Sequence, residues 1–158
     1  MTSTPFDARV AALDAGSLAE LMRGRHSVRA FTDRPIEGTV REALERQVAA
    51  ENERAGLSVQ LCLDAPGAFD GMLAHYGSFR NVRNHLALVG PAGPGLDEAV
   101  GYPGEKIVLL ARALGLDSCC GNWGRGISLR EKYPVPNFAP SPISDYSEFL
   151  VPSPSLSR

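Results

Sequence analysis

Residues 97–115 decide the fold; in one-letter code they read DEAVGYPGEKIVLLARALG. Apolar side chains cover most of the circumference of a helix drawn through the second half of this stretch, and Gly115 is typical of a residue that ends a helix. We expect a helix over about residues 97–114. Because Pro103 lacks a backbone N–H, this helix either starts near Gly101 or is kinked at the proline. A helix that is apolar on nearly all sides must be surrounded by other elements, and we expect it at the centre of the protein.

Two more helices are expected before this central helix. The first falls within residues 1–35 and ends near Gly24, with Ser17 and Glu20 at the spacing of a capping box. The second covers about residues 38–55, where apolar residues recur at helical spacing and Gly56 takes the position after the last turn.

Two strands complete the recognisable core. Apolar and polar residues alternate over residues 57–63, which is the pattern of a strand with one buried face. A continuous apolar run over residues 86–89 predicts a second, more deeply buried strand. Residues 90–95, with the sequence GPAGPG, are expected to form a loop because the context of a phosphate-binding motif is absent.

The character of the chain changes after Cys120. Residues 121–158 hold six of the twelve prolines and show no clear helical or strand period, although they are rich in aromatic residues. The sequence therefore divides into a core region, 1–120, and an atypical Pro/Ser-rich tail, 121–158.

Composition limits the classes of function. The chain has 158 residues, which is typical of one domain, and a net charge of −2 gives no overall attraction for nucleic acid or anionic membranes. No apolar run is long enough to cross a bilayer. Three cysteines form neither a disulfide framework nor a CxxC pair, as expected for reduced thiols in a cytoplasmic protein. We expect no nucleic-acid partner and no membrane partner.

The segment from Arg25 to Arg29 is the strongest candidate for a binding site in the sequence. If it is extended, the side chains of Arg25, Ser27 and Arg29 point to one side, where two guanidinium groups and a hydroxyl could bind one phosphate. His26 lies between them. A solvated charged turn explains the same residues, and the sequence alone leaves both interpretations open.

No other constellation predicts a catalytic or metal site. His75 and His85 have no partner at metal-ligand spacing, and Cys119 and Cys120 are more typical of buried apolar residues than of a redox pair. Neither a Ser/His/Asp arrangement nor a pair of carboxylates is present, so we assign no catalytic residue and no metal.

Three stretches of the sequence are informative when they are taken in order. They are Gly24-Arg25-His26-Ser27-Val28-Arg29-Ala30-Phe31 followed by Pro35-Ile36; Tyr76-Gly77-Ser78-Phe79-Arg80-Asn81-Val82-Arg83-Asn84-His85-Leu86-Ala87-Leu88-Val89-Gly90; and Gly101-Tyr102-Pro103-Gly104-Glu105-Lys106 with Ala111-Arg112-Ala113-Leu114-Gly115-Leu116-Asp117-Ser118-Cys119. Together they resemble the nitroreductase family of flavin oxidoreductases, in the branch with shorter chains. The resemblance covers roughly residues 17–120.

The resemblance implies an α+β, three-layer fold with a mixed β-sheet flanked by helices, incomplete at its C-terminus through truncation, a frameshifted reading or a divergent tail. It also implies an FMN-dependent oxidoreductase that takes electrons from NADH or NADPH and reduces nitro compounds, quinones or similar small-molecule acceptors as a homodimer. Carried over to this chain, the FMN contacts would be Arg25, His26, Ser27 and Arg29, with Arg80, or Arg83 in its place, near the flavin. The alternative is a degenerate, non-catalytic member that binds a phosphorylated ligand or a partner protein.

Overall fold

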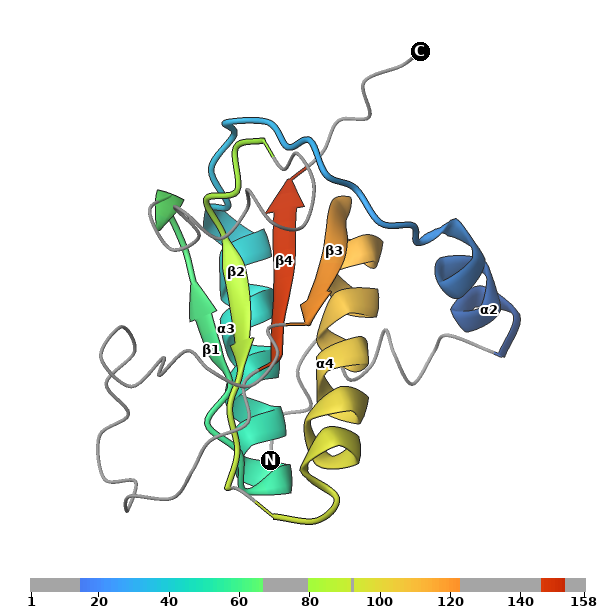
Figure 1. Cartoon of the computed structure of the whole chain (residues 1–158). Helices are drawn as coiled ribbons and strands as arrows, with labels where there is room; N and C mark the ends of the chain where they lie inside the picture. Colours follow the sequence, from blue (N-terminus) through green and yellow to red (C-terminus); the bar gives the residue numbers. More distant parts are fainter. Residues whose placement is uncertain (1–14, 67–79, 92, 123–145, 153–158) are drawn as a thin grey trace.

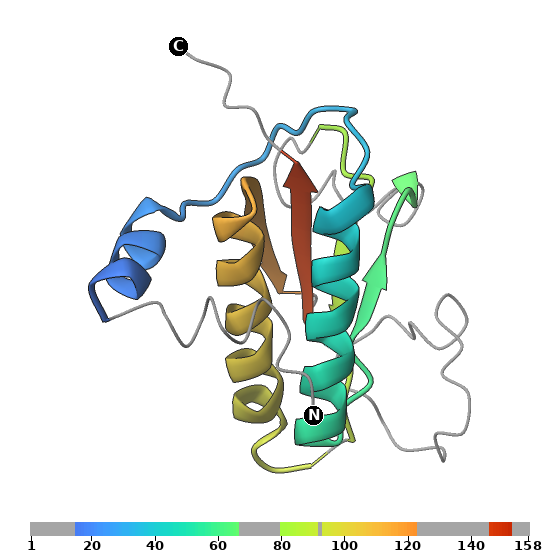
Figure 2. The same ribbon diagram turned by 180° about the vertical axis from the view of Figure 1, so that it is seen from behind.

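The computed structural model describes residues 15–66, 80–91, 93–122 and 146–152. In this part of the chain, two long helices lie side by side on one face of a four-stranded sheet, as both views show (Figure 1, Figure 2). They are α3 (Gly38–Ala55) and α4 (Leu96–Ala113). A shorter helix, α2 (Ala15–Gly24), lies beside α4 on the side away from α3.

The sheet has the strand order β1-β2-β4-β3, and all three pairings of neighbouring strands are antiparallel. Its strands are β1 (Gln60–Cys62), β2 (His85–Leu88), β3 (Leu116–Asn122) and β4 (Tyr146–Pro152). Parallel pairing occurs in two isolated bridges, Ser27 with Ser118 and Ala30 with Arg80. Helices packed on a sheet of this kind make an α+β fold, as predicted.

The predictions for the helices are confirmed, with one correction. Helix α4 spans Leu96–Ala113, close to the predicted 97–114, and holds Pro103 in its interior, so the alternative of a start near Gly101 is excluded. Ser17 lies inside α2 and not in front of it, so the capping-box spacing does not mark the helix start. Two of the three glycines predicted at helix ends have left-handed backbones, with φ of 64° at Gly56 and 84° at Gly115.

The tail contains a strand that the sequence pattern did not reveal. Strand β4 lies between β2 and β3, pairing Leu86 with Glu148 and Cys119 with Phe149. The expectation that residues 121–158 contain no regular element is therefore wrong for 146–152. Tyr, Phe, Leu and Val favour strands, but here they do not alternate with polar residues and they stand among prolines and serines.

The core lies between the two long helices and the sheet. Its most deeply buried large side chains include Leu44 of α3, Leu86 of β2 and Ile107 of α4, all with no exposed surface. Gly104 allows α4 to approach the sheet closely, because a Cβ atom there would lie 2.8 Å from Leu88 Cδ1. Gly104 is thus a close-packing glycine.

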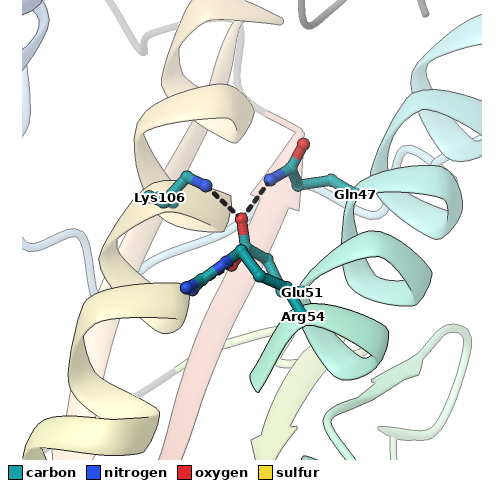
Figure 3. A network of polar contacts seen from close by, with 4 residues as sticks. All are labelled: Gln47, Glu51, Arg54 and Lys106. Carbon is teal, nitrogen blue, oxygen red and sulfur yellow. Dashed lines mark hydrogen bonds and ion pairs between the residues drawn. The ribbon is translucent and has the colours of Figure 1, made fainter. Parts of the chain in front are cut away.

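A buried ionic cluster joins α3 to α4 (Figure 3). Glu51, only 2% exposed, accepts hydrogen bonds from Gln47 Nε2 at 2.8 Å, from Arg54 Nη2 at 2.6 Å and from Lys106 Nζ. Burial alone would raise the pKa of Glu51, but the hydrogen bonds and charges of Lys106 and Arg54 outweigh it and hold the pKa below its ordinary value. The cluster therefore keeps Glu51 ionised between the helices.

None of the helices in the described ranges is both long enough and apolar enough to span a membrane.

Candidate functional site

The connector, defined as residues 25–37, joins α2 to α3 and carries most of the predicted site residues. It is extended beside β3, where Val28 N donates to Ser118 O at 3.1 Å. Further along, Arg80 N donates to Arg29 O at 2.9 Å and Phe31 N donates to Arg80 O at 3.1 Å. The fold therefore brings Arg29 and Arg80, which are far apart in sequence, into direct backbone contact.

Arg25 is the only predicted site residue with a half-buried side chain. Its Nε lies 3.7 Å from Glu105 Oε1 of α4, and its Nη1 is buried with no hydrogen-bond partner among the described residues. A buried cationic donor without an acceptor costs free energy, so the position favours an anion. This is the observation that fits a phosphate group to the connector.

The other predicted contacts lie on the surface. His26, Ser27, Arg29 and Arg80 are exposed, and His26 Nδ1 lies 3.3 Å from Gly24 O. An extended backbone at Ser27 and Ala30, where the two bridges form, agrees with the conformation assumed from the sequence. The role of these side chains in binding FMN remains a prediction.

Arg83, the alternative to Arg80, is engaged elsewhere. Its Nε donates to Asp64 Oδ1 at 3.0 Å, and its Nη2 is in contact with the same oxygen. The ion pair ties the end of β1 to the segment that precedes β2. This arrangement gives Arg83 a structural partner, whereas Arg80 lies beside the connector.

Sequence reasoning missed the residues that support Arg25. Glu105 is 80 positions away in the chain, and nothing in its neighbourhood indicates the contact. Arg112 Nη1 donates to Asp117 Oδ1 at 2.6 Å, and a Cβ on Gly24 would lie 3.6 Å from Arg112 Nη2. Arg112 and Asp117 thus fix the junction between α2, α4 and β3 from which the connector starts.

Two cavities lie along the second half of the connector. They have volumes of about 420 Å³ and about 300 Å³, and both are lined by residues 34–37. None of the five predicted FMN contacts lines either cavity. These cavities are therefore separate from the predicted phosphate-binding residues.

The remaining sequence candidates are structural where they can be seen. His85 is 1% exposed in β2, and Cys119 is a buried thiol in β3. His75 lies outside the described residues. Across the described ranges, no three His, Cys, Asp or Glu side chains are grouped so that they could hold a metal ion.

Comparisons with known proteins agree on one group. The sequence model of the family described as "Putative TM nitroreductase" matches residues 17–132, more than half of the chain. No curated protein matches the chain in sequence.

Solved structures with the same fold include two from Clostridium difficile and one from Desulfovibrio desulfuricans. An FMN-dependent nitroreductase from strain R20291 is 17% identical with a TM-score of 0.66, covering 87% of this chain and 88% of that one. A nitroreductase family protein from strain 630 is 16% identical with a TM-score of 0.62, covering 87% and 84%. The Desulfovibrio protein, described as a putative nitroreductase in complex with FMN, is 18% identical with a TM-score of 0.59, covering 89% and 90%. At these identities the similarity shows a shared fold.

Proposed function

The chain belongs to the family described as "Putative TM nitroreductase", and from this premise we propose that it is an FMN-dependent oxidoreductase. The observation that carries the proposal is the buried Nη1 of Arg25, a cationic donor with no acceptor among the described residues. A phosphate oxygen is the acceptor that an arginine in this position suits best, because charge-assisted hydrogen bonds of this kind are strong.

The residues of the connector fit the phosphate end of FMN. Arg25 would donate to the phosphate, while Glu105 holds the Nε side of the same guanidinium and so limits its orientation. Ser27 and Arg29 offer further donors on the same extended segment, with His26 between them. Arg80, held beside Arg29 by backbone hydrogen bonds, adds a positive charge that favours the reduced, more negative flavin.

The chemistry that bound FMN supplies is the transfer of two electrons as hydride from NADH or NADPH to a nitro compound, a quinone or a similar acceptor. The chain's own task is to bind, orient and tune the cofactor. This division of labour explains why the site is built from arginines and a serine and needs no catalytic acid or base. An enzyme that draws electrons from NADH or NADPH needs the nicotinamide pool of the cytoplasm, so the proposal includes a cytoplasmic location.

The proposal also includes a homodimer. Helix α2 lies beside α4 and exposes two large apolar side chains one turn apart, Leu18 at 38% and Met22 at 55%. Exposed apolar side chains on one helix face are typical of an interaction surface. A second copy of the chain is the partner we propose for this face.

The test is the visible absorption spectrum of the purified chain after incubation with FMN and gel filtration. We expect a flavin spectrum that elutes with the protein and is bleached by NADH or NADPH. Riboflavin, which lacks the phosphate, should be retained much less, because it leaves Arg25 Nη1 without its acceptor. A folded, colourless protein would contradict the proposal and favour the non-catalytic alternative.

A further inference from the structure

Asn81 lies where the segment that leads into β2 meets the connector, directly after Arg80. Its backbone has a φ of 58°, in the left-handed region that residues other than glycine rarely adopt. Asparagine is one of the few residues that tolerate this conformation, because its short amide group can form local hydrogen bonds. The residue type therefore suits a turn that most other side chains would destabilise.

The side chain of Asn81 forms a hydrogen bond with the connector. Its Nδ2 donates to Phe31 O at 3.0 Å, across 50 positions of sequence. Arg80 exchanges two backbone hydrogen bonds with the same stretch, since Arg80 N donates to Arg29 O and Phe31 N donates to Arg80 O. Both the N–H and the C=O of Phe31 are therefore bonded to residues 80 and 81.

These bonds form one of two attachments that hold the connector. The other is the hydrogen bond from Val28 N to Ser118 O of β3, at 3.1 Å. The side chain of Phe31 is 6% exposed, so it anchors the first attachment in the protein interior. Arg29 lies between the two attachments, and its backbone is fixed on both sides.

The left-handed turn alone does not explain why residue 81 has an amide side chain. Glycine adopts the same φ without strain, but it has no group that could donate to Phe31 O. A hydrogen bond between neutral groups shifts a local equilibrium by about fivefold. Because connecting segments open locally more easily than a core does, a shift of this size at Asn81 changes how often the connector is attached.

We propose that Asn81 is a positioning residue for flavin binding. Its side chain keeps the connector docked, with residues 29–31 hydrogen-bonded to residues 80–81, so that Arg29 and Arg80 lie together at the cofactor. A chain with an undocked connector does not present these two guanidinium groups together, and the apparent affinity falls with the fraction of docked chains. The proposal rests on the proposed FMN-dependent function and extends it to a residue that acts through others.

The experiment compares Asn81→Gly with the wild type in two measurements. Glycine keeps the left-handed backbone and removes only the side-chain donor. Without FMN, amide hydrogen exchange at Phe31 should become about fivefold faster, because the docked connector opens more often. Fluorescence titration should show FMN binding about fivefold weaker. Unchanged exchange at Phe31, or unchanged FMN affinity, would overturn the proposal.

Asn52→Ala is the matched control. Asn52 also donates through Nδ2 to a backbone carbonyl, Val59 O at 2.8 Å, but it joins α3 to the residue before β1. Alanine suits the helical backbone of Asn52 as glycine suits the left-handed backbone of Asn81. We expect Asn52→Ala to lower the urea midpoint and to leave exchange at Phe31 and FMN affinity unchanged. An equal loss of FMN affinity in this control would reduce the effect of Asn81 to general stability and overturn the proposal.

A second variant, Asn81→Asp, tests the donor itself. Aspartate also tolerates the left-handed backbone, but its carboxylate cannot donate to Phe31 O. It should weaken FMN binding at least as much as Asn81→Gly, and wild-type affinity would overturn the proposal. A wild type that retains no FMN would overturn the proposed function and this role with it. A wild type that binds FMN no better than Asn81→Gly would overturn the role of Asn81 alone.

Discussion

Two groups of charged side chains in this molecule differ in how completely their charges are compensated. In the cluster between α3 and α4, both carboxylate oxygens of Glu51 accept hydrogen bonds from neighbouring side chains (Figure 3). In the connector, Arg25 Nη1 is buried without an acceptor among the described residues. The hydrogen bonds of the Glu51 carboxylate are therefore made within the protein, whereas Arg25 Nη1 can still donate a hydrogen bond to a ligand.

This difference is invisible in composition. Both groups consist of arginine, glutamate and their neighbours, and both would be described from sequence as charged helix or loop surface. What separates them is whether each buried donor and acceptor has a partner, and that depends on the packing of elements distant in sequence. Three variants or conditions test this separation.

The largest expected effect is on stability. Glu51→Ala removes the acceptor of Gln47, Arg54 and Lys106, and we expect it to lower the free energy of unfolding by about 3 kcal/mol, at the lower end for a broken buried ion pair because Arg54 and Lys106 reach solvent. FMN affinity should stay within about twofold of the wild type. Urea unfolding and FMN titration measure the two quantities. The control is Glu42→Ala, which breaks an exposed pair on the same helix and should cost well below 1 kcal/mol.

The next largest effect is expected on FMN affinity, with little change in stability. Arg25→Ala should weaken FMN binding by about 1.5–3 kcal/mol, the scale of a charge-assisted hydrogen bond, and leave the urea midpoint nearly unchanged. Ser27→Ala should cost less, because a neutral hydroxyl makes a weaker bond. Fluorescence titration of FMN measures both, with Arg46→Ala as the control. Wild-type affinity in Arg25→Ala would contradict the phosphate-binding role, and a large loss of stability would place Arg25 with the structural group.

The smallest expected effect is a loss of stability at acidic pH. Because the folded pKa of Glu51 lies below its ordinary value of 4.5, the cluster contributes its full stability at neutral pH, begins to lose it below about 4.5 and has lost it below the folded pKa. The difference in free energy of unfolding between the wild type and Glu51→Gln should therefore shrink as the pH falls from 7 to about 3. Urea unfolding at a series of pH values checks this. Parallel curves would mean that Glu51 has the same pKa in the folded and unfolded chain.

The sequence predicted the helices well because their signals are local. Apolar residues at helical spacing and the glycines at positions 56 and 115 define α3 and α4 almost to the residue. Strand β4 was not predicted because its position depends on pairing with β2 and β3, which lie tens of residues earlier in the chain. The local sequence of a short apolar run among prolines does not indicate which strands it pairs with.

The candidate site was predictable in residue type but not in partnership. Arg25, Ser27 and Arg29 were identified by their spacing, and Arg80 by resemblance. Glu105 comes to lie beside Arg25 only through tertiary packing. Sequence analysis can therefore nominate a donor, but it cannot say whether the folded chain satisfies that donor.

The position of β4 has a consequence for synthesis on the ribosome. Among the four strands, the one made last occupies an inner place, and it alone joins β2 to β3. Until Pro152 has left the exit tunnel, β2 and β3 each present an unpaired edge to solvent or to other nascent chains. The sheet is thus completed only when the strand made last inserts between β2 and β3.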